Sequence, residues 1–279
     1  MPKLQGRLAI VTGASAGIGA ATARLFAAEG ARLVLNARRK ERLEAVASET
    51  GAVAVVGDIT DPAVQGALVE AAGGRVDLLV NNAGYGEPGP VELVPEEAAR
   101  RQLEVNLFAA AALARAVLPL MRAQRSGRIL NVSSIAGRMG YPLFGWYCAS
   151  KHALEGLSDA LRFEARPFGI QVCLVEPGPI ATEFFEVARA RSAPLLLDPG
   201  SPYRPLYAQA DAIEERFRKQ AVPAEAVARV LLRAATARRP RARYAVHRMA
   251  KASMLALRLL PRSLVDFIVR QQFRVPKRM

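Results

Sequence analysis

The chain has 279 residues, of which 51% are hydrophobic and 23% are charged, a composition that excludes a disordered or collagen-like protein. The net charge of +14 is concentrated at one end: residues 216–279 hold 17 Lys/Arg and two acids, whereas residues 1–215 hold 22 Lys/Arg and 23 acids. No apolar run reaches the roughly 18 residues of a spanning helix, and the first residues lack a signal-peptide core. The two cysteines give no disulfide framework, so we expect a cytoplasmic protein.

Apolar runs that favour strands alternate with helical patterns along most of the chain. We expect strands at 8–11, 33–35, 53–56, 76–80, 129–132, 170–175 and 244–246. Helices are expected at 18–28, at 39–48, from Pro62, at 95–122 with an interruption near Pro119, and from Tyr147 to Arg166. Each strand is apolar on both faces, which predicts a doubly wound, mostly parallel seven-stranded sheet with helices on both faces.

The Pro- and Gly-rich stretch 194–205 is interpreted as a loop that does not separate two domains. We therefore expect a single α/β domain over residues 1–279. Within it, a segment at 183–222 would lie over the site, and a basic extension would cover 248–279.

A glycine-rich turn joins the first strand to the first helix. Glycine permits positive φ and leaves room for a pyrophosphate against the backbone, and the helix N-terminus adds free N–H groups. Many tight turns bind nothing, but this position in a βαβ unit favours a dinucleotide site. Its contacts would come from Gly13, Ser15, Gly17, Ile18 and Gly19.

The end of the second strand indicates which dinucleotide binds. A site for NAD would place an acid there to accept from the adenosine 2′-hydroxyl. This chain has Arg38 and Arg39 instead, and planar guanidinium groups suit a 2′-phosphate. The two arginines can also simply open a charged helix. We predict NADP(H) as the cofactor.

Two more strand ends carry polar groups toward the same edge of the sheet. Asp58 and Ile59 follow the third strand, where the carboxylate can accept from an adenine amino group or can cap the helix that Pro62 opens. Asn82, Ala83 and Gly84 end the fourth strand, and they would contact the cofactor, shape a turn, or do both.

Tyr147 and Lys151 are four residues apart, and Ser134 lies thirteen residues before the tyrosine. Positions i and i+4 of a helix share a face, so an ammonium would lie beside a phenol. A nearby cation lowers a phenol pKa from its usual value of about 10, and the phenol can then exchange protons with a substrate. Taken alone, the pair is also common on solvated helices.

The turn at 12–19, the segment 81–84, the Ser134/Tyr147/Lys151 set and Pro177-Gly178 occur in the order typical of one family. Together they resemble the short-chain dehydrogenase/reductase family, in its single-domain branch of about 250 residues with a Rossmann fold. The resemblance covers roughly residues 4–182.

The resemblance implies a role for each matching position. Tyr147 corresponds to the general acid/base and Ser134 to the hydroxyl that polarises the carbonyl, although Ser133 competes for that role. Lys151 would bind the nicotinamide ribose and lower the tyrosine pKa, and Asn106 would support a proton-relay water. Tyr147 also borders the cofactor, and the nicotinamide end would be met by Pro177, Gly178, Ile180 and Thr182.

The implied function is an NADP(H)-dependent oxidoreductase that interconverts an alcohol and a carbonyl by hydride transfer. The apolar and aromatic content of 183–222 suggests a hydrophobic substrate, although ordinary packing explains it equally well. Two other classes remain open: a cofactor-binding regulatory or scaffold protein, and a membrane-surface protein whose enzyme domain is secondary.

The basic extension alternates apolar residues with arginines, and Pro261 would split it into two short helices. Such a segment can lie on an anionic membrane, or it can pack on the body or on a neighbouring subunit. We expect no nucleic-acid partner and no metal site. The family resemblance implies a homodimer or homotetramer paired through the helices at 95–122 and 147–166.

Overall fold

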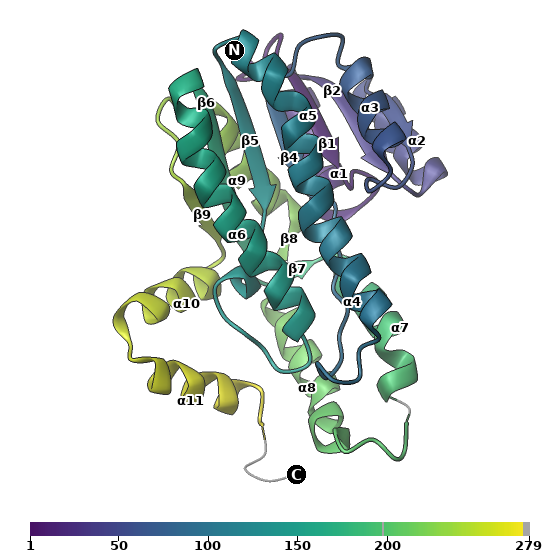
Figure 1. The fold of residues 1–279 in the computed structure, drawn as a ribbon, viewed down its shortest axis with the longest axis vertical. Helices are drawn as coiled ribbons and strands as arrows, with labels where there is room; N and C mark the ends of the chain where they lie inside the picture. Colours follow the sequence, from purple (N-terminus) through teal and green to yellow (C-terminus); the bar gives the residue numbers. More distant parts are fainter. Residues whose placement is uncertain (197, 276–279) are drawn as a thin grey trace.

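The computed structural model describes residues 1–196 and 198–275; residue 197 of the expected covering segment and residues 276–279 of the extension lie outside the described residues. Within these ranges, seven parallel strands form one sheet in the order β3-β2-β1-β4-β5-β6-β9 (Figure 1). The predicted fold class is confirmed. The strands are β1 (Leu8–Thr12), β2 (Arg32–Ala37), β3 (Val53–Val56), β4 (Leu78–Asn81), β5 (Gly127–Val132), β6 (Ile170–Pro177) and β9 (Arg243–Val246).

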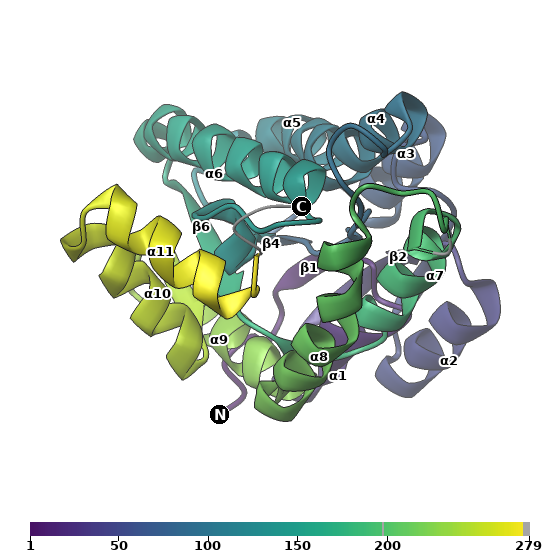
Figure 2. The same cartoon turned by 90° about the horizontal axis from the view of Figure 1, so that it is seen from below.

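Helices cover both faces of the sheet, as Figure 2 shows along the strands. Alternate strand residues supply the two cores, because successive side chains of a strand point to opposite faces. On β1, Ala9 and Val11 pack on one side, and Leu8 and Ile10 pack on the other. The first face carries α1 (Gly17–Ala28), α2 (Lys40–Thr50) and α9 (Ala224–Thr236); the second carries α3 (Pro62–Ala71), α4 (Glu96–Leu103), α5 (Ala109–Ala123) and α6 (Gly145–Ala165).

The strand order creates a crevice at the carboxyl ends of β1 and β4. The chain leaves β1 for β2 on one side and later returns to β4 on the other, so the two connections diverge. Ligands of open α/β sheets bind at this kind of switch point. The expectation that each strand is buried on both faces fails at β3, where Val53 and Val56 are 51% and 39% exposed because β3 lies at the edge of the sheet.

The interruption predicted near Pro119 is wrong. Pro119 lies inside α5, and the helix continues to Ala123. A proline removes one hydrogen bond to the carbonyl four residues earlier, here Arg115, and both residues are on the exposed side where water replaces that bond. The irregular turn lies upstream instead: Glu104–Phe108 is π-helical and joins α4 to α5.

Together these segments make one continuous helix, Glu96–Ala123. In the part of the chain that the structure describes, it is long and apolar enough to cross a membrane by length and composition, which corrects the expectation that no segment reaches that length. Core helices of globular proteins meet the same two criteria. Here Leu113, Val117 and Met121 are fully buried against the sheet.

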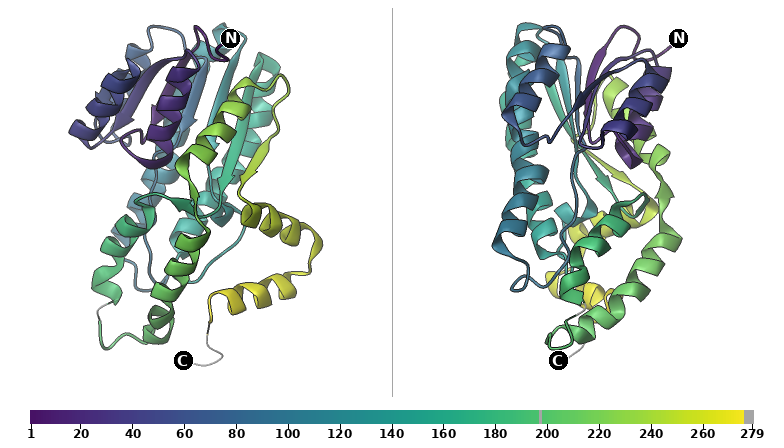
Figure 3. Two further views of the ribbon diagram at one scale, coloured as in Figure 1. Left: turned by 180° about the vertical axis from the view of Figure 1, so that it is seen from behind. Right: turned by 90° about the vertical axis from the view of Figure 1, so that its right-hand side faces the viewer.

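Four helices gather at the carboxyl ends of the strands (Figures 1 and 3). They are α7 (Phe184–Leu196), α8 (Arg204–Gln220), α10 (Arg248–Leu259) and α11 (Arg262–Gln272). The predicted division of the tail at Pro261 is confirmed, but the loop predicted at 194–205 is shorter because α7 extends into it and α8 begins within it. A short pair of strands, β7 (Ile180–Ala181) and β8 (Val222–Pro223), closes the base of this region and was not predicted.

Candidate active site

The glycine-rich turn is held tightly against the end of β4. Gly13 has φ +66°, and a Cβ on it would lie 2.9 Å from the Ala83 Cα. A Cβ on Gly19 would lie 2.2 Å from the Gly13 carbonyl oxygen, so only glycine lets α1 approach the turn this closely. The Thr12 hydroxyl accepts hydrogen bonds from the backbone N–H groups of Asn82 and Ala83, both at 3.0 Å. Thr12 was missed by sequence reasoning, although its place before Gly13 is a usable signal.

The N-terminus of α1 has the chemistry that a pyrophosphate requires. Its N-cap residue is Ala16, in extended conformation, and no side chain among residues 1–196 and 198–275 caps the helix. The first turn contains no acid, so the free backbone N–H groups and the positive end of the helix dipole favour binding of an anion there. These residues fit a dinucleotide phosphate.

One cavity of about 570 Å³ begins at this turn, passes Tyr147 and ends among aromatic side chains of the covering helices. The sequence-predicted site residues line it, with two exceptions. Gly19 lies behind the turn, where it permits the close packing of α1. Asn106 lies behind Gly84 and Lys151: a Cβ on Gly84 would be 3.0 Å from Asn106 Oδ1 and 3.5 Å from Lys151 Nζ.

Two arginines border the adenosine end of the cavity, but they are engaged differently. Arg39 pairs with Glu183 at 2.6 Å and donates to Ser15 Oγ at 3.3 Å. Arg42 holds the other Glu183 oxygen at 2.5 Å. Arg38 is exposed at the cavity wall. Arg38 is therefore the better placed of the two predicted arginines to meet a new anion.

Asp58 lines the cavity, and its carboxylate is already partnered. It accepts from the backbone N–H and hydroxyl of Thr60 at 3.0 and 2.8 Å and pairs with Arg101. Burial opposes its ionisation, but these hydrogen bonds and the arginine charge outweigh burial and hold the pKa of Asp58 below its usual value. The alternative that Asp58 caps the next helix is wrong, because Asp61 caps α3 by accepting from the Ala63 N–H at 2.8 Å.

The end of β5 and the first turns of α6 bring together the three residues predicted to act in catalysis. Lys151 Nζ donates to the carbonyl of Val132, the last residue of β5, at 2.9 Å. It lies 6.0 Å from the centre of the Tyr147 ring. Ser134 lines the cavity with Tyr147 and lowers the tyrosine pKa, whereas Ser133 Oγ is buried with no hydrogen-bond partner among the described residues. This geometry favours Ser134 over Ser133.

The expected lowering of the tyrosine pKa is wrong for this structure. Burial raises the pKa of Tyr147 to about 12, and the hydrogen bond with Ser134 offsets only part of that shift. Burial also lowers the pKa of Lys151 to about 8, against the opposing charge of Glu155. The sequence shows that the two groups share a helix face, but the sign of the shift depends on desolvation, which is a property of the whole fold.

Asn106 is 1% exposed and sits in the π-helical turn, a feature that often marks functional sites. Its Nδ2 donates to the Tyr85 carbonyl at 2.9 Å and to Ser150 Oγ at 3.0 Å, and its Oδ1 accepts from the Tyr85 N–H at 3.0 Å. These bonds tie the α4–α5 helix to α6 immediately before Lys151. Both polar atoms of the buried Asn106 amide therefore have hydrogen-bond partners, as buried polar groups in proteins generally do.

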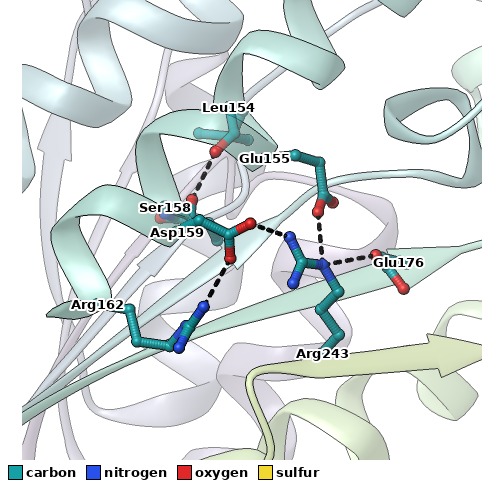
Figure 4. A network of polar contacts seen from close by, with 8 residues as sticks. Leu154, Glu155, Ser158, Asp159, Arg162, Glu176 and Arg243 are labelled. Carbon is teal, nitrogen blue, oxygen red and sulfur yellow. Dashed lines mark hydrogen bonds and ion pairs between the residues drawn. The ribbon is translucent and has the colours of Figure 1, made fainter.

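A cluster of three carboxylates, of which Glu155 and Glu176 are buried, begins one helical turn after Lys151, and sequence reasoning missed it (Figure 4). Arg243 of β9 is paired with Glu155 at 3.0 Å, with Asp159 at 2.6 Å and, more loosely, with Glu176 at 3.4 Å. Three carboxylates thus share one guanidinium, with a second partner for Asp159 in Arg162. Burial and the neighbouring Glu155 raise the pKa of Glu176 to about 7.

The aromatic end of the cavity forms a chain of ring contacts. Tyr147 contacts Phe184 at 5.5 Å between ring centres, Phe184 contacts Phe185 at 5.6 Å, and Phe185 contacts Phe217 at 6.2 Å. Phe273 then meets Phe217 at 6.0 Å and stacks on Tyr141 at 5.2 Å. Phe217 and Phe273 were missed, because nothing local in the sequence relates the C-terminus to Tyr147.

Comparison with known proteins identifies the family. The sequence model of the protein family described as short chain dehydrogenase matches residues 7–193. The chain therefore belongs to the short-chain dehydrogenase/reductase family. Its members include NAD(P)-dependent oxidoreductases, and this chain has the same fold.

Three similar proteins show what this sequence is related to. The NADPH-dependent 3-dehydrocapnine reductase of Ornithobacterium rhinotracheale is 37% identical over 94% of this chain and 95% of the relative. The 3-ketodihydrosphingosine reductase of Bacteroides thetaiotaomicron is 42% identical over 65% of this chain and 66% of the relative. A short-chain dehydrogenase/reductase from Burkholderia phymatum, solved in complex with NAD, superposes with a TM-score of 0.79 at 28% identity, over 96% of this chain and 97% of that one.

The raised pKa of Glu176 predicts a pH-dependent stability. The folded protein keeps the Glu176 proton up to about pH 7, whereas an unfolded glutamate loses it near the ordinary pKa of 4.5. The contribution of this proton to the free energy of unfolding is therefore fully present below pH 4.5 and is lost as the pH rises to 7. Glu176→Gln should remove this loss, which amounts to as much as about 3 kcal/mol. Urea unfolding at stepped pH measures it.

The exposed Glu164, on the same α6 helix as Glu155, offers a matched control. Glu164→Gln should keep the wild-type fall in unfolding free energy between pH 5 and 7. An identical slope in wild type and Glu176→Gln would contradict the assignment of the proton to Glu176.

Proposed function

We propose that this protein is an NADP(H)-dependent reductase that converts the ketone of a long-chain, lipid-like substrate to an alcohol. The observation that carries the proposal is the position of Tyr147, Ser134 and Lys151 midway along one cavity. A glycine-rich phosphate turn lies at one end of that cavity and a chain of aromatic rings at the other.

Several residues would hold the cofactor. The turn from Gly13 to Gly19 and the free N-terminus of α1 would bind the pyrophosphate. Arg38 would meet the 2′-phosphate, and Asp58 would lie beside the adenine. The nicotinamide ribose would be met by Tyr147 and Lys151, and the nicotinamide itself by the cavity-lining residues Pro177, Gly178, Ile180 and Thr182.

Bound NADPH would supply the hydride for the carbonyl carbon. Tyr147 Oη would donate a proton to the substrate oxygen while Ser134 Oγ hydrogen-bonds to the same oxygen, where negative charge develops. Lys151, with a pKa of about 8, is largely cationic at neutral pH, and its charge favours the phenolate left by that transfer. A phenol with a pKa of about 12 is protonated at neutral pH, which is the state that can donate this proton.

Two lines of reasoning support the substrate class. The far end of the cavity is lined by aromatic side chains, among them Phe184, Phe185, Phe217 and Phe273, which suit an apolar chain. The two curated relatives are named as reductases of 3-dehydrocapnine and of 3-ketodihydrosphingosine. A 3-keto long-chain base is therefore the substrate to test first.

Tyr147→Phe should lower kcat by about 10²- to 10⁴-fold, because it removes the proton donor and leaves the ring. NADPH binding, followed by fluorescence, should stay within a few-fold of wild type. The matched Tyr→Phe change at Tyr203, which lies outside the cavity lining, should leave kcat unchanged. Wild-type turnover by Tyr147→Phe would refute the role.

The same assay separates this proposal from a cofactor-binding regulator. A panel of long-chain ketones with NADPH should show consumption by the wild type. NADPH binding without any consumption on the panel would favour the regulatory alternative.

The preference for NADP(H) over NAD(H) rests on Arg38 and Arg39, on the lack of an acid there, and on the NADPH dependence named for one relative. Arg38→Asp should raise the KM for NADPH by about tenfold or more and move preference toward NADH, because it replaces a phosphate donor by a like charge. The exposed Arg229→Asp on α9 should change neither KM. A wild-type preference for NADH would contradict the inference.

We also propose that copies of the chain pair through α5 and α6. Phe108, directly before α5, and Leu157 and Phe163 of α6 are exposed large hydrophobic residues, and Ala109–Ala112 would permit close helix approach. Phe163→Glu should shift the mass measured by light scattering toward the monomer, since it buries a charge in the interface. Val53→Glu, at the exposed sheet edge, should not. A wild-type monomer would contradict the proposal.

A further inference from the structure

The C-terminal helix α11 carries apolar side chains on two opposite faces. Val265 of α11, and Phe273 directly after it, are 5% and 6% exposed and pack inward. Leu264, Phe267 and Ile268 are 42%, 55% and 41% exposed, and their i, i+3, i+4 spacing places them on one outer face. A helix that only covered the body would be polar on that side.

The neighbouring helix α10 extends this apolar surface. Leu255 and Leu259, one turn apart, are 58% and 66% exposed. The two helices thus hold five of the thirteen large hydrophobic side chains that are exposed in the described chain. We call this surface the outer tail face; it consists of Leu255, Leu259, Leu264, Phe267 and Ile268.

The segment that carries the outer tail face is strongly basic in sequence. Residues 248–279 contain eight Lys/Arg and a single acid, Asp266, which is paired with Arg262 at 3.2 Å. Lys251, Arg270 and Arg274 are exposed alongside the apolar residues. Apolar residues on one face of a helix, bordered by cations, are what binds a helix to an anionic lipid surface.

The tail reaches the cavity through Phe273, the residue directly after α11. Phe273 lines the cavity and stacks on Tyr141, and the Arg216 guanidinium of α8 donates to the Gln272 carbonyl at 2.5 Å. Figures 1 and 2 show α10 and α11 beside the carboxyl ends of the strands. The cavity lining includes residues at the same ends, among them Val132 of β5 and Pro177 of β6. Whatever the outer tail face binds is therefore brought next to the substrate end of the site.

We propose that the outer tail face docks on an anionic lipid bilayer, with Leu264, Phe267 and Ile268 among the acyl chains. Docking would let a long-chain ketone pass from the bilayer into the cavity past Phe273. This passage rests on the proposed function, whereas the docking itself does not. A second copy of the chain is a poorer occupant, because the two like-charged tails would repel each other. A nucleic acid would leave the apolar residues unpaired.

The test is sedimentation of the full-length protein with sucrose-loaded vesicles of phosphatidylcholine and phosphatidylglycerol in about a 3:1 ratio, without substrate or cofactor. The wild type should bind these vesicles at low salt, bind pure phosphatidylcholine at least about tenfold more weakly, and be released as salt rises. Phe267→Ser/Ile268→Ser should bind the anionic vesicles about tenfold or more weakly, because it removes the inserted side chains.

Two further variants make the result specific. Val53→Ser/Val56→Ser removes two exposed valines at the distant sheet edge and should bind as the wild type does. Lys251→Glu/Arg274→Glu keeps every apolar residue and should weaken binding at low salt by about tenfold or more. Circular dichroism and NADPH binding show whether each variant is folded.

Equal vesicle binding by the wild type and the Phe267→Ser/Ile268→Ser variant would overturn the proposal. So would a change in the mass of that variant in solution with vesicle binding intact, which would assign the outer tail face to a second copy. Failure of the proposed function has a different signature: vesicle binding by the wild type with no NADPH consumption on any long-chain ketone.

Discussion

The hydrogen bond from Lys151 to the Val132 carbonyl is the contact on which the site depends. It fixes the first turns of α6 to the end of β5, and so it sets where Tyr147 and Ser134 meet. A buried ammonium is unfavourable unless it is partnered. Here a strand carbonyl and, one helical turn later, the charge of Glu155 offset that penalty, while Asn106 holds α6 from the other side.

The two ends of the cavity differ in how they are built. The end near Gly13 is made by backbone and by short polar side chains, with Thr12 holding the turn and the β4 end in register. The far end is made by rings from separate segments: the Phe184–Phe185 and Phe217–Phe273 contacts are edge to face, and the Phe185–Phe217 contact is stacked. The first end is built from strand ends and the turn that follows β1. The second is built from segments that lie beyond the carboxyl ends of the strands.

This difference explains what could be predicted from the sequence. The strands, the glycine turn and the position of Tyr147 follow from short-range patterns, so they were found. The continuity of α5 through Pro119 depends on which side of the helix faces water, and the direction of the tyrosine pKa shift depends on burial. Phe273 and the Glu155–Glu176–Arg243 cluster join segments far apart in the chain, and no local pattern marks them.

The two arginines that pair with Glu183 have a thermodynamic consequence. Glu183, just before α7, is gripped by Arg39 and Arg42 together. An anion that binds Arg39 must break the ion pair between Arg39 and Glu183. By reciprocity, contacts that keep Glu183 paired lower the affinity of the site for the anion. Exposed pairs of this kind are worth about 1 kcal/mol or less, so the coupling amounts to a few-fold in affinity. Anion binding at the nucleotide end of the cavity and the position of α7 are thus coupled through the Glu183 carboxylate.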